Sequence, residues 1–325
     1  MHPLIRDIKH SLRPEYKNYL NKFASVMDSN IALVDSVAKY IVRHKGKGLR
    51  PLLVILSAKI LDKPNDNTYL VAALIEILHT ATLVHDDVVD KASTRRNFPS
   101  VNAIWKNKIS VLMGDYLLAK SLISATKTNS LEIMNILAVT AKRLSEGELF
   151  QIEKSRKLDI TETEYFKLVS DKTAALISAC CELGAMTVNS SPEQRQALRS
   201  YGENLGIAFQ IKDDILDYEG KQKIIGKPVG ADLKEKKITL PLILALDQAP
   251  APERKKIIKL VRKGITRTDV KAVLNFTEHY NGLNKARQEA EKYAHRAREN
   301  INVFPPSPDK DNVLKFVEYV IQRKK

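Results

Sequence analysis

Apolar residues recur at helical spacing along almost the whole chain. One stripe contains Leu70, Ala73, Leu74, Ile77 and Leu78, because positions three and four apart lie on one face of an α-helix. We find no alternation of apolar and polar residues between turn signals, which a half-buried strand would show. Glycine is also sparse, with 12 residues in 325. The chain is therefore expected to be all-α.

Clusters of glycine, proline and asparagine divide this pattern into roughly ten to thirteen expected helices. A hydrophobic fraction of 44% is enough for a large core. No low-complexity linker divides the sequence, so we expect a single domain over residues 1–325. Ser100 is expected to cap the helix that follows it, and Asp66 or Asn67 the long helix that carries the first acidic motif.

The net charge of +15 indicates an anionic partner, which is nucleic acid, anionic lipid or a phosphorylated substrate. No nucleic acid is expected, because no nucleic-acid-binding module is visible and the few aromatic residues do not alternate with basic ones. The basic segment ERKKIIKLVRKG reads as a solvated helix face, with a membrane-surface patch as the alternative.

The adjacent Cys180 and Cys181 point in different directions on a helix and cannot easily form a disulfide. They read as small core residues in a reducing compartment. The N-terminal segment lacks the apolar stretch of a signal peptide. We therefore expect a cytoplasmic protein whose contact with a membrane surface is at most transient.

One acidic pattern occurs twice, each time within an apolar segment. The two copies are Asp86-Asp87-x-x-Asp90 and Asp213-Asp214-x-x-Asp217. Residues four apart project from nearly the same face of a helix, so the first and last aspartates of each motif lie side by side. The middle aspartate points about 100° away and is expected in a supporting or surface position.

Paired carboxylates in a partly buried cleft repel each other by on the order of several kcal/mol. Bound cations remove this cost. With oxygen ligands and no neighbouring cysteine or histidine cluster, the ion expected is Mg²⁺, which commonly shares its ligands with substrate phosphates. A single motif could be a solvated acidic face, but two copies favour two helices that clamp metal ions and a diphosphate between them.

Basic residues near the motifs support a diphosphate ligand. Lys47 and Arg50 lie in the segment KGKGLRP, and Arg95 and Arg96 follow the first motif. Arginine offers a planar fork for phosphate oxygens and lysine a mobile point charge. Each segment alone reads as a surface turn. Together they suit two diphosphates, one bridged to carboxylates by magnesium and the other held directly by basic side chains.

Seven segments now occur in the order typical of one family. They are HTATLVHDDVVD, TRR, SVLMGDYLLAKSL, SEGELFQIE, KTAALISACC, AFQIKDDILDYEG and GKPVGADLKEKKITLP. Over residues 40–241 the chain resembles the trans-polyprenyl diphosphate synthases, with the greatest likeness to bacterial octaprenyl-type enzymes of quinone biosynthesis. The resemblance implies an isoprenoid-synthase-type helical bundle around a central cavity, usually as a homodimer.

The resemblance also implies roles for single residues. It implies about three Mg²⁺ ions, with Asp86, Asp90 and Asp213 as ligands and Asp87, Asp214 and Asp217 in support. The residues implied at the allylic diphosphate are Arg95, Lys172, Lys227 and Lys237, with Thr173 and Gln210 facing the developing cation. Those implied at isopentenyl diphosphate are Lys47, Arg50, His79 and Arg96.

The chain departs from the family pattern at a few positions. The loop reads Lys45-Gly46-Lys47-Gly48 where the family has Gly-Gly-Lys-Arg, a departure that bears only on the path of this loop. Asn97 replaces a common glycine, and asparagine tolerates the left-handed conformation that a turn needs there. Lys236 also stands where glycine is frequent.

The resemblance implies addition of isopentenyl diphosphate to an allylic diphosphate such as farnesyl diphosphate. Product length is expected to depend on Ala81, Thr82 and Leu78, because small side chains before Asp86 let a growing chain pass. By family analogy the product is octaprenyl diphosphate, for quinone side chains. The alternative interpretation of Ala81 and Thr82 is that they only permit close helix packing.

Three alternative functions are compatible with parts of the sequence. Two of them are a shorter-chain geranylgeranyl synthase and a non-catalytic partner subunit of a heteromeric synthase. A terpene cyclase would share the first motif but not the intact second one. A partner subunit tends to lose the aspartates, whereas this chain keeps all six.

Overall fold

The structure, a computed structural model, describes residues 2–44, 46–219 and 230–323. Its contacts divide the chain into two compact units, and each is described by itself. Unit 1 comprises Met1–Lys142, Leu176–Gly202 and Ile301–Phe316. Unit 2 comprises Arg143–Ala175, Glu203–Asn300 and Val317–Lys325. The single domain over residues 1–325 stays a prediction.

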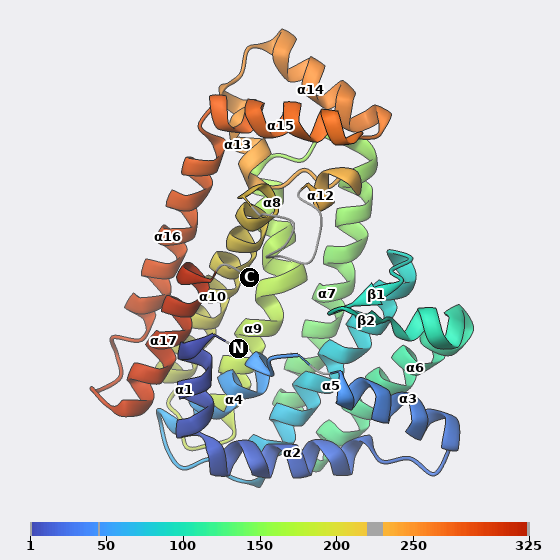
Figure 1. Cartoon of the computed structure of the whole chain (residues 1–325). Helices are drawn as coiled ribbons and strands as arrows, with labels where there is room; N and C mark the ends of the chain where they lie inside the picture. Colours follow the sequence, from blue (N-terminus) through green and yellow to red (C-terminus); the bar gives the residue numbers. More distant parts are fainter. Residues whose placement is uncertain (1, 45, 220–229, 324–325) are drawn as a thin grey trace. The chain divides into compact units, whose positions relative to one another are not determined.

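The elements of the first half, whose α-helices and β-strands are labelled in Figure 1, are α1 (Pro3–Ser11), α2 (Arg13–Met27), α3 (Ala32–Arg43), α4 (Leu49–Lys59), α5 (Asp66–Val89), β1 (Thr94–Arg95), β2 (Phe98–Pro99), α6 (Val101–Ala125), η1 (Thr126–Thr128) and α7 (Leu131–Lys157). Those of the second half are α8 (Glu162–Val169), η2 (Ser170–Ala174), α9 (Ala175–Met186), α10 (Pro192–Glu219), α12 (Ala231–Lys234), α13 (Leu240–Gln248), α14 (Ala251–Lys263), α15 (Arg267–His279), α16 (Gly282–Asn300) and α17 (Pro308–Gln322).

The all-α fold predicted from the sequence is confirmed. The described residues form sixteen α-helices, more than the ten to thirteen expected. One reason lies in the C-terminal third, where residues at positive φ end helices early. Gly264 ends α14 with φ 97°, and Asn281 lies between α15 and α16 with φ 57°. Such a left-handed residue stops a helix within one position.

Unit 1 is built around α5. This helix packs mainly against α6, and also against α2 and α4. Its residues from Thr68 to Leu78 are all buried. Because every face of this part of the helix is covered, apolar residues occur there also outside the stripe seen in the sequence. Cys180 and Cys181, also in unit 1, are buried free thiols, as the sequence predicted.

The starts of α5 and α6 show which residues cap them. The Asn65 side chain accepts from the N–H groups of Asn67 and Thr68, at 2.9 and 3.2 Å. The hydroxyl of Thr68 accepts from the N–H of Asn65 at 3.1 Å, which completes a capping box. The expectation that Asp66 or Asn67 caps α5 was therefore wrong. For α6 the prediction is confirmed, because Ser100 Oγ accepts from the Ala103 N–H at 3.0 Å.

Among the described residues, two helical segments are long and apolar enough to span a membrane by length and composition alone: α5, and Val101–Thr128, which comprises α6 and η1. A core helix of a globular protein meets the same criteria, and 78% of the apolar window of α5 is buried inside the fold. For Val101–Thr128 the buried share is 39%, and its exposed apolar side chains include Val111, Leu112 and Ile123. The apolar character of α5 is therefore explained by its place in the core of unit 1.

In unit 2, α13 lies beside α15 and α16, as Figure 1 shows. Leu240 and Leu242 of α13 are completely buried. The facing side of α16 carries buried alanines about one turn apart, including Ala286, Ala290 and Ala294. Small residues at this spacing let two helices approach closely.

Candidate functional site

The first acidic motif lies at the C-terminal end of α5. Asp86 is partly buried and Asp90, the C-cap residue, is exposed; the Asp90 N–H donates to the Asp86 carbonyl at 2.8 Å. The carbonyl end of a helix carries partial negative charge, which disfavours carboxylates there. A bound cation would offset this cost, so the end of α5 is suited to hold one.

The middle aspartate of this motif is turned inward. Asp87 is 2% exposed, and the Nε of Arg95 donates to its Oδ1 at 2.7 Å. Burial raises the pKa of Asp87, and the charge and hydrogen bond of Arg95 act against that rise. Arg95, which the resemblance assigned to the allylic diphosphate, is thus held by a buried carboxylate.

Arg95 belongs to a short hairpin that the sequence did not predict. Thr94 pairs with Pro99 and Arg95 with Phe98. The two turn residues, Arg96 and Asn97, have φ values of 55° and 67°. Positive φ at both positions is the pattern of a type I′ turn, so the left-handed conformation proposed for Asn97 is confirmed.

The guanidinium of Arg96 lies against the backbone of Gly46. A Cβ at Gly46 would stand 2.5 Å from Arg96 Cζ, closer than real side chains approach. Gly48 is also needed, because it has φ 64° at the start of α4. These two glycines keep the loop in place beside Arg96, whereas Lys45 lies outside the described residues.

A cavity of about 70 Å³ opens beside this hairpin within unit 1, and His79, Arg95 and Arg96 are among its lining residues. The pKa of His79 lies well below its usual value, first because of burial and then because of the positive charges of Arg50, Arg96 and Arg95. A neutral histidine surrounded by guanidinium groups forms a site that favours an anion.

Glu76 lines the same cavity and is 8% exposed. Burial lowers the pKa of Arg50 and of Arg96, and the negative charge of Glu76 is the largest influence opposing that change. Sequence reasoning missed this residue. The available signal was a single glutamate within the run LVAALIEIL, one turn before His79.

The other residues assigned to isopentenyl diphosphate differ in their surroundings. Arg50 lies in the first turn of α4, and its Nε is buried without a hydrogen-bond partner in the described part of the chain. An unpaired buried donor is costly, so this atom has capacity for an anionic oxygen. Lys47 is exposed on the preceding loop and is not among the residues that line the cavity.

The residues predicted to govern product length lie one to two turns before Asp86 on α5. Leu78 and Ala81 are each 2% exposed. Thr82 is partly buried, and its hydroxyl donates to the His79 carbonyl at 2.8 Å. Their role in product length stays a prediction.

The second acidic motif lies near the end of α10, in unit 2. Asp213 is exposed and forms an ion pair with Arg323, whose side chain is 4% exposed. The Arg323 guanidinium stacks 3.7 Å from the ring centroid of Phe209 and donates to the Phe209 carbonyl at 3.0 Å. No sequence pattern predicted this partner, because Arg323 lies about a hundred residues further along the chain.

Asp217 holds the chain where it returns to α10. Its carboxylate accepts from the N–H groups of Ala231 and Asp232, at 3.1 and 3.3 Å, and so caps α12. Lys236 follows with φ 59°, a left-handed conformation that suits the glycine implied at this position by the resemblance. Lys227 lies outside the described residues.

Lys172 and Thr173 lie in η2, a single π-helical turn between α8 and α9. Such turns insert one extra residue and often occur at functional sites. Lys172 forms an ion pair with Glu148 and donates to Gln151 Oε1 at 3.0 Å, both on α7. Gly147 permits this approach, because a Cβ there would stand 2.8 Å from the Lys172 backbone nitrogen.

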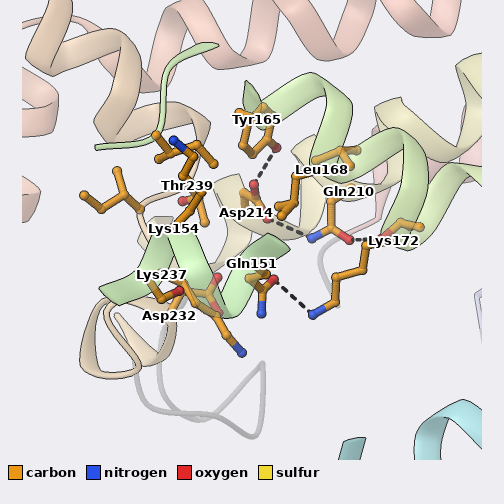
Figure 2. A pocket seen from close by; sticks show the side chains of 15 residues that line it. Gln151, Lys154, Tyr165, Leu168, Lys172, Gln210, Asp214, Asp232, Lys237 and Thr239 are labelled. Atoms are coloured by element: carbon orange, nitrogen blue, oxygen red, sulfur yellow. Dashed lines mark hydrogen bonds between the residues drawn. The ribbon is translucent and has the colours of Figure 1, made fainter. Parts of the chain in front are cut away.

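Four side chains form one hydrogen-bonded chain in unit 2 (Figure 2). The Thr173 hydroxyl donates to Gln210 Oε1 at 2.8 Å, and Gln210 Nε2 donates to Asp214 Oδ1 at 2.9 Å. The Tyr165 hydroxyl donates to Asp214 Oδ2 at 2.5 Å. Both oxygens of Asp214, which is 3% exposed, are therefore hydrogen-bonded within the protein.

This chain borders a cavity of about 150 Å³ whose lining includes Lys154, Lys172 and Lys237. The Nζ of Lys237 donates to Glu235 at 2.6 Å. The structure thus brings together four residues that the resemblance assigned to the allylic substrate, namely Lys172, Thr173, Gln210 and Lys237. The lining also includes the carboxyl groups of Asp214 and Asp232, so the three lysines outnumber the acidic groups by one, which favours an anionic ligand such as diphosphate.

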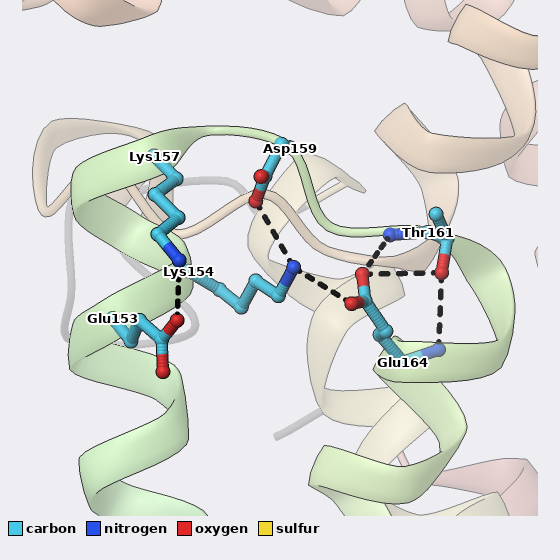
Figure 3. A network of polar contacts seen from close by, with 6 residues as sticks. All are labelled: Glu153, Lys154, Lys157, Asp159, Thr161 and Glu164. Carbon is cyan, nitrogen blue, oxygen red and sulfur yellow. Dashed lines mark hydrogen bonds and ion pairs between the residues drawn. The ribbon is translucent and has the colours of Figure 1, made fainter.

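Lys154 was not predicted as a site residue. It joins the end of α7 to the start of α8 through ion pairs with Glu164 at 2.7 Å and Asp159 at 3.1 Å (Figure 3). Glu164 also accepts from the Thr161 N–H, and its own N–H donates to Thr161 Oγ1. This network fixes the first turn of α8, where Tyr165 lies.

The acidic motifs fit a hard cation that takes part of its coordination from water or substrate. Among residues 2–44, 46–219 and 230–323, no three His, Cys, Asp or Glu side chains gather into a complete metal site. Asp86, Asp90 and Asp213 nevertheless offer oxygen atoms at partly or fully exposed positions. Mg²⁺ prefers such incomplete carboxylate sites, because it retains waters and binds substrate phosphates.

Comparisons with known proteins agree with these features. The profile of the family described as polyprenyl synthetase matches residues 31–277. The chain is 33% identical to the octaprenyl diphosphate synthase of Escherichia coli (strain K12), over 91% of this chain and 92% of that protein.

Two solved structures are similar over nearly the whole chain. One is the polyprenyl synthase of Caulobacter crescentus complexed with calcium and isoprenyl diphosphate. It has a TM-score of 0.92 and 31% identity, over 99% of this chain and 98% of that chain. The other is the geranylgeranyl pyrophosphate synthase of Bacteroides thetaiotaomicron, with TM-score 0.84, 36% identity and coverage of 99% and 100%.

The family match covers most of the chain, and the similar structures share its isoprenoid-synthase fold over almost its full length. The prediction made from the ordered sequence motifs is therefore confirmed. The chain belongs to the polyprenyl synthetase family and is a trans-polyprenyl diphosphate synthase, a prenyltransferase.

Proposed function

We propose that this enzyme uses Mg²⁺ to add isopentenyl diphosphate to an allylic diphosphate such as farnesyl diphosphate, and that its product is octaprenyl diphosphate for quinone side chains. The observation that carries this proposal is the lysine-lined cavity of unit 2. Its wall holds Lys172 and Lys237 beside the neutral acceptors Thr173 and Gln210. A cavity with both features suits a diphosphate leaving group and the allylic cation that it leaves.

The protein's own side chains have distinct tasks in this proposal. Lys172 and Lys237 stabilise negative charge on the departing diphosphate, and oxygen atoms of Thr173 and Gln210 face the positive charge on the allylic carbons. In unit 1, Arg96 and His79 hold the diphosphate of the second substrate. Asp86, Asp90 and Asp213 hold Mg²⁺, which when bound supplies further positive charge to the allylic diphosphate.

Octaprenyl length is supported by the small side chain of Ala81 and by the similarity to the E. coli octaprenyl enzyme. The second candidate is a geranylgeranyl synthase, which the 36% identity to the Bacteroides thetaiotaomicron enzyme favours. A bulky side chain near Ala81 would favour that shorter product, and this chain has none at position 81 or 82.

A homodimer, a cytoplasmic location and transient membrane contact are further parts of the proposal. Exposed apolar side chains on α6 and α7, such as Leu112, Ile123 and Leu131, suit burial against a second copy. The basic, largely exposed α14 suits a brief contact with anionic lipid. Light scattering of the purified protein tests the homodimer. Co-sedimentation with phosphatidylserine vesicles tests the membrane contact.

The catalytic proposal is tested with purified enzyme, labelled isopentenyl diphosphate and farnesyl diphosphate, with Mg²⁺ and with chelator. We expect Mg²⁺-dependent extension, with octaprenyl diphosphate as the main product in chromatography. A C20 product would support the geranylgeranyl alternative. A cyclic hydrocarbon would indicate a cyclase, and no incorporation by the pure chain would indicate a partner subunit.

A further inference from the structure

We propose that Asp214 and Tyr165 are positioning residues that orient Gln210 and Thr173 toward the allylic cation, and that Asp214 is not a metal ligand. The inference rests on the proposed function, because it takes the lysine-lined cavity of unit 2 as the allylic site. It changes the assignment of one aspartate of the second motif and adds a tyrosine that the sequence did not single out.

Both carboxylate oxygens of Asp214 are engaged in hydrogen bonds with protein side chains. Its Oδ1 accepts from Gln210 at 2.9 Å and its Oδ2 accepts from Tyr165 at 2.5 Å. Tyr165 is 2% exposed and Asp214 is 3% exposed. Asp213, the preceding residue, has a side chain that is 46% exposed. The helix therefore presents Asp213 outward, while both oxygens of Asp214 serve hydrogen bonds inside unit 2.

The direction of each hydrogen bond determines which atoms of Gln210 and Thr173 remain available to the cavity. Both oxygens of Asp214 accept hydrogen bonds, one of them from Gln210 Nε2, so the NH₂ of Gln210 is turned toward Asp214 and its amide oxygen away from it. That oxygen then accepts the hydroxyl hydrogen of Thr173, at 2.8 Å. With its hydrogen engaged, the Thr173 oxygen has lone pairs left for the cavity. A cation is stabilised by such oxygen lone pairs and not by hydroxyl hydrogens.

Contacts of the neighbouring residue hold Tyr165 in place. Tyr165 comes directly after Glu164 on α8, and Glu164 is ion-paired with Lys154 of α7 (Figure 3). The same stretch of α7 carries Gln151, which accepts from Lys172. Tyr165 thus reaches Asp214 from a helix turn tied to the element that also holds the diphosphate lysine. Figure 2 shows Tyr165, Asp214, Gln210 and Lys172 around one pocket.

The test uses Tyr165→Phe and Asp214→Asn in the full-length enzyme. Tyr165→Phe removes one oxygen atom and frees Asp214 to turn, so kcat should fall about tenfold or more. In Asp214→Asn an amide can donate to Gln210 and reverse its orientation, so the loss should be larger. The KM of both substrates should stay within about twofold, and the double variant should be no slower than Asp214→Asn alone.

A second readout follows the metal without turnover. Calorimetry with Mg²⁺ and inorganic pyrophosphate should give the same metal affinity for wild type and Asp214→Asn, within about twofold, whereas Asp213→Asn should weaken it. Tyr201→Phe is the matched control, because Tyr201 is equally buried on α10 and donates to the Val313 carbonyl in unit 1. Its kcat should not change.

Wild-type kcat in Tyr165→Phe would overturn the inference, and so would metal affinity lost in Asp214→Asn as in Asp213→Asn. If Asp214→Asn does not fold, as judged by thermal unfolding, Tyr165→Phe alone decides through its kcat. A wild-type protein that elongates no substrate would contradict the proposed function and this inference with it. An active wild type with an unaffected Tyr165→Phe variant would contradict the inference alone.

Discussion

The two acidic motifs have the same spacing but different partners. In both, the middle aspartate is almost fully buried, at 2% for Asp87 and 3% for Asp214. Asp87 is neutralised by the guanidinium of Arg95, whereas Asp214 accepts from the neutral groups of Tyr165 and Gln210. The motif therefore fixes which helix face carries the carboxylates, and each unit supplies its own means of satisfying the buried one.

This difference separates the two copies in function. In unit 1, the buried aspartate holds an arginine that also lines a cationic cavity. In unit 2, it orients an amide and a hydroxyl, and the positive charge comes from lysines on other elements. The first motif thus positions a charged side chain, Arg95, whereas the second positions the neutral side chains of Gln210 and Thr173.

The largest effect is expected where the copies agree. Asp86→Asn and Asp213→Asn should each lower kcat/KM by about 10²- to 10³-fold, because each removes an oxygen ligand and a negative charge. Asp247→Asn, at an exposed position of α13, is the control and should have no effect. The measurement is steady-state elongation at saturating Mg²⁺. A severe loss in one variant with normal activity in the other would show that the motifs are not equivalent.

The copies should differ in control of product length. Ala81 and Ala208 stand five residues before the first aspartate of their motifs, and both are buried. Ala81→Phe should shift the main product to shorter chains by several isoprene units, because only α5 is proposed to border the growing chain. Ala208→Phe carries a similar overpacking cost, about 1–3 kcal/mol, without a length change. Product chromatography decides, and unchanged length in Ala81→Phe would contradict the assignment.

Stability should reveal the charged partner in unit 1. Arg95→Met leaves Asp87 buried without its counterion, and we expect the free energy of unfolding to fall by about 1–3 kcal/mol, since Arg95 is itself partly exposed. Arg95→Lys should recover part of this loss. Urea unfolding provides the measurement. An Arg95→Met variant as stable as wild type would show that the ion pair does not matter to the fold.

The smallest effect concerns pH. The pKa of His79 is held well below its usual value in the free protein, and a bound diphosphate should raise it toward that value. The complex then binds more protons than the free protein, so affinity should rise by a few-fold as pH is lowered below about 6.5. Calorimetry with isopentenyl diphosphate in two buffers measures the proton uptake. Equal pH dependence in His79→Gln would exclude His79 as its source.

Much of this architecture follows from local patterns in the sequence. Helical spacing predicted an all-α fold, and the position of Ser100 predicted its cap on α6. The need for a left-handed residue predicted the conformation of Asn97. These features depend on a few consecutive residues, so they can be recognised without knowing the tertiary structure.

Other features depend on partners distant in sequence. Nothing near Asp213 indicates Arg323, and nothing near Asp214 indicates Tyr165, since both contacts arise only when separate elements pack together. The π-helical turn that presents Lys172 and Thr173 has no distinct composition. The prediction that Asp87 and Asp214 support the metal did not consider that burial would give each a protein partner. The expectation that the two acidic helices face one another stays a prediction.

The central claim is that both motifs bind cations around the same diphosphate. The most direct measurement is anomalous scattering from Mn²⁺ in crystals of the enzyme grown with inorganic pyrophosphate. We predict Mn²⁺ peaks at Asp86 and Asp90 and at Asp213, with one pyrophosphate ligating the ions at both motifs. Peaks at one motif alone, or two motifs on surfaces that share no opening, would contradict the account.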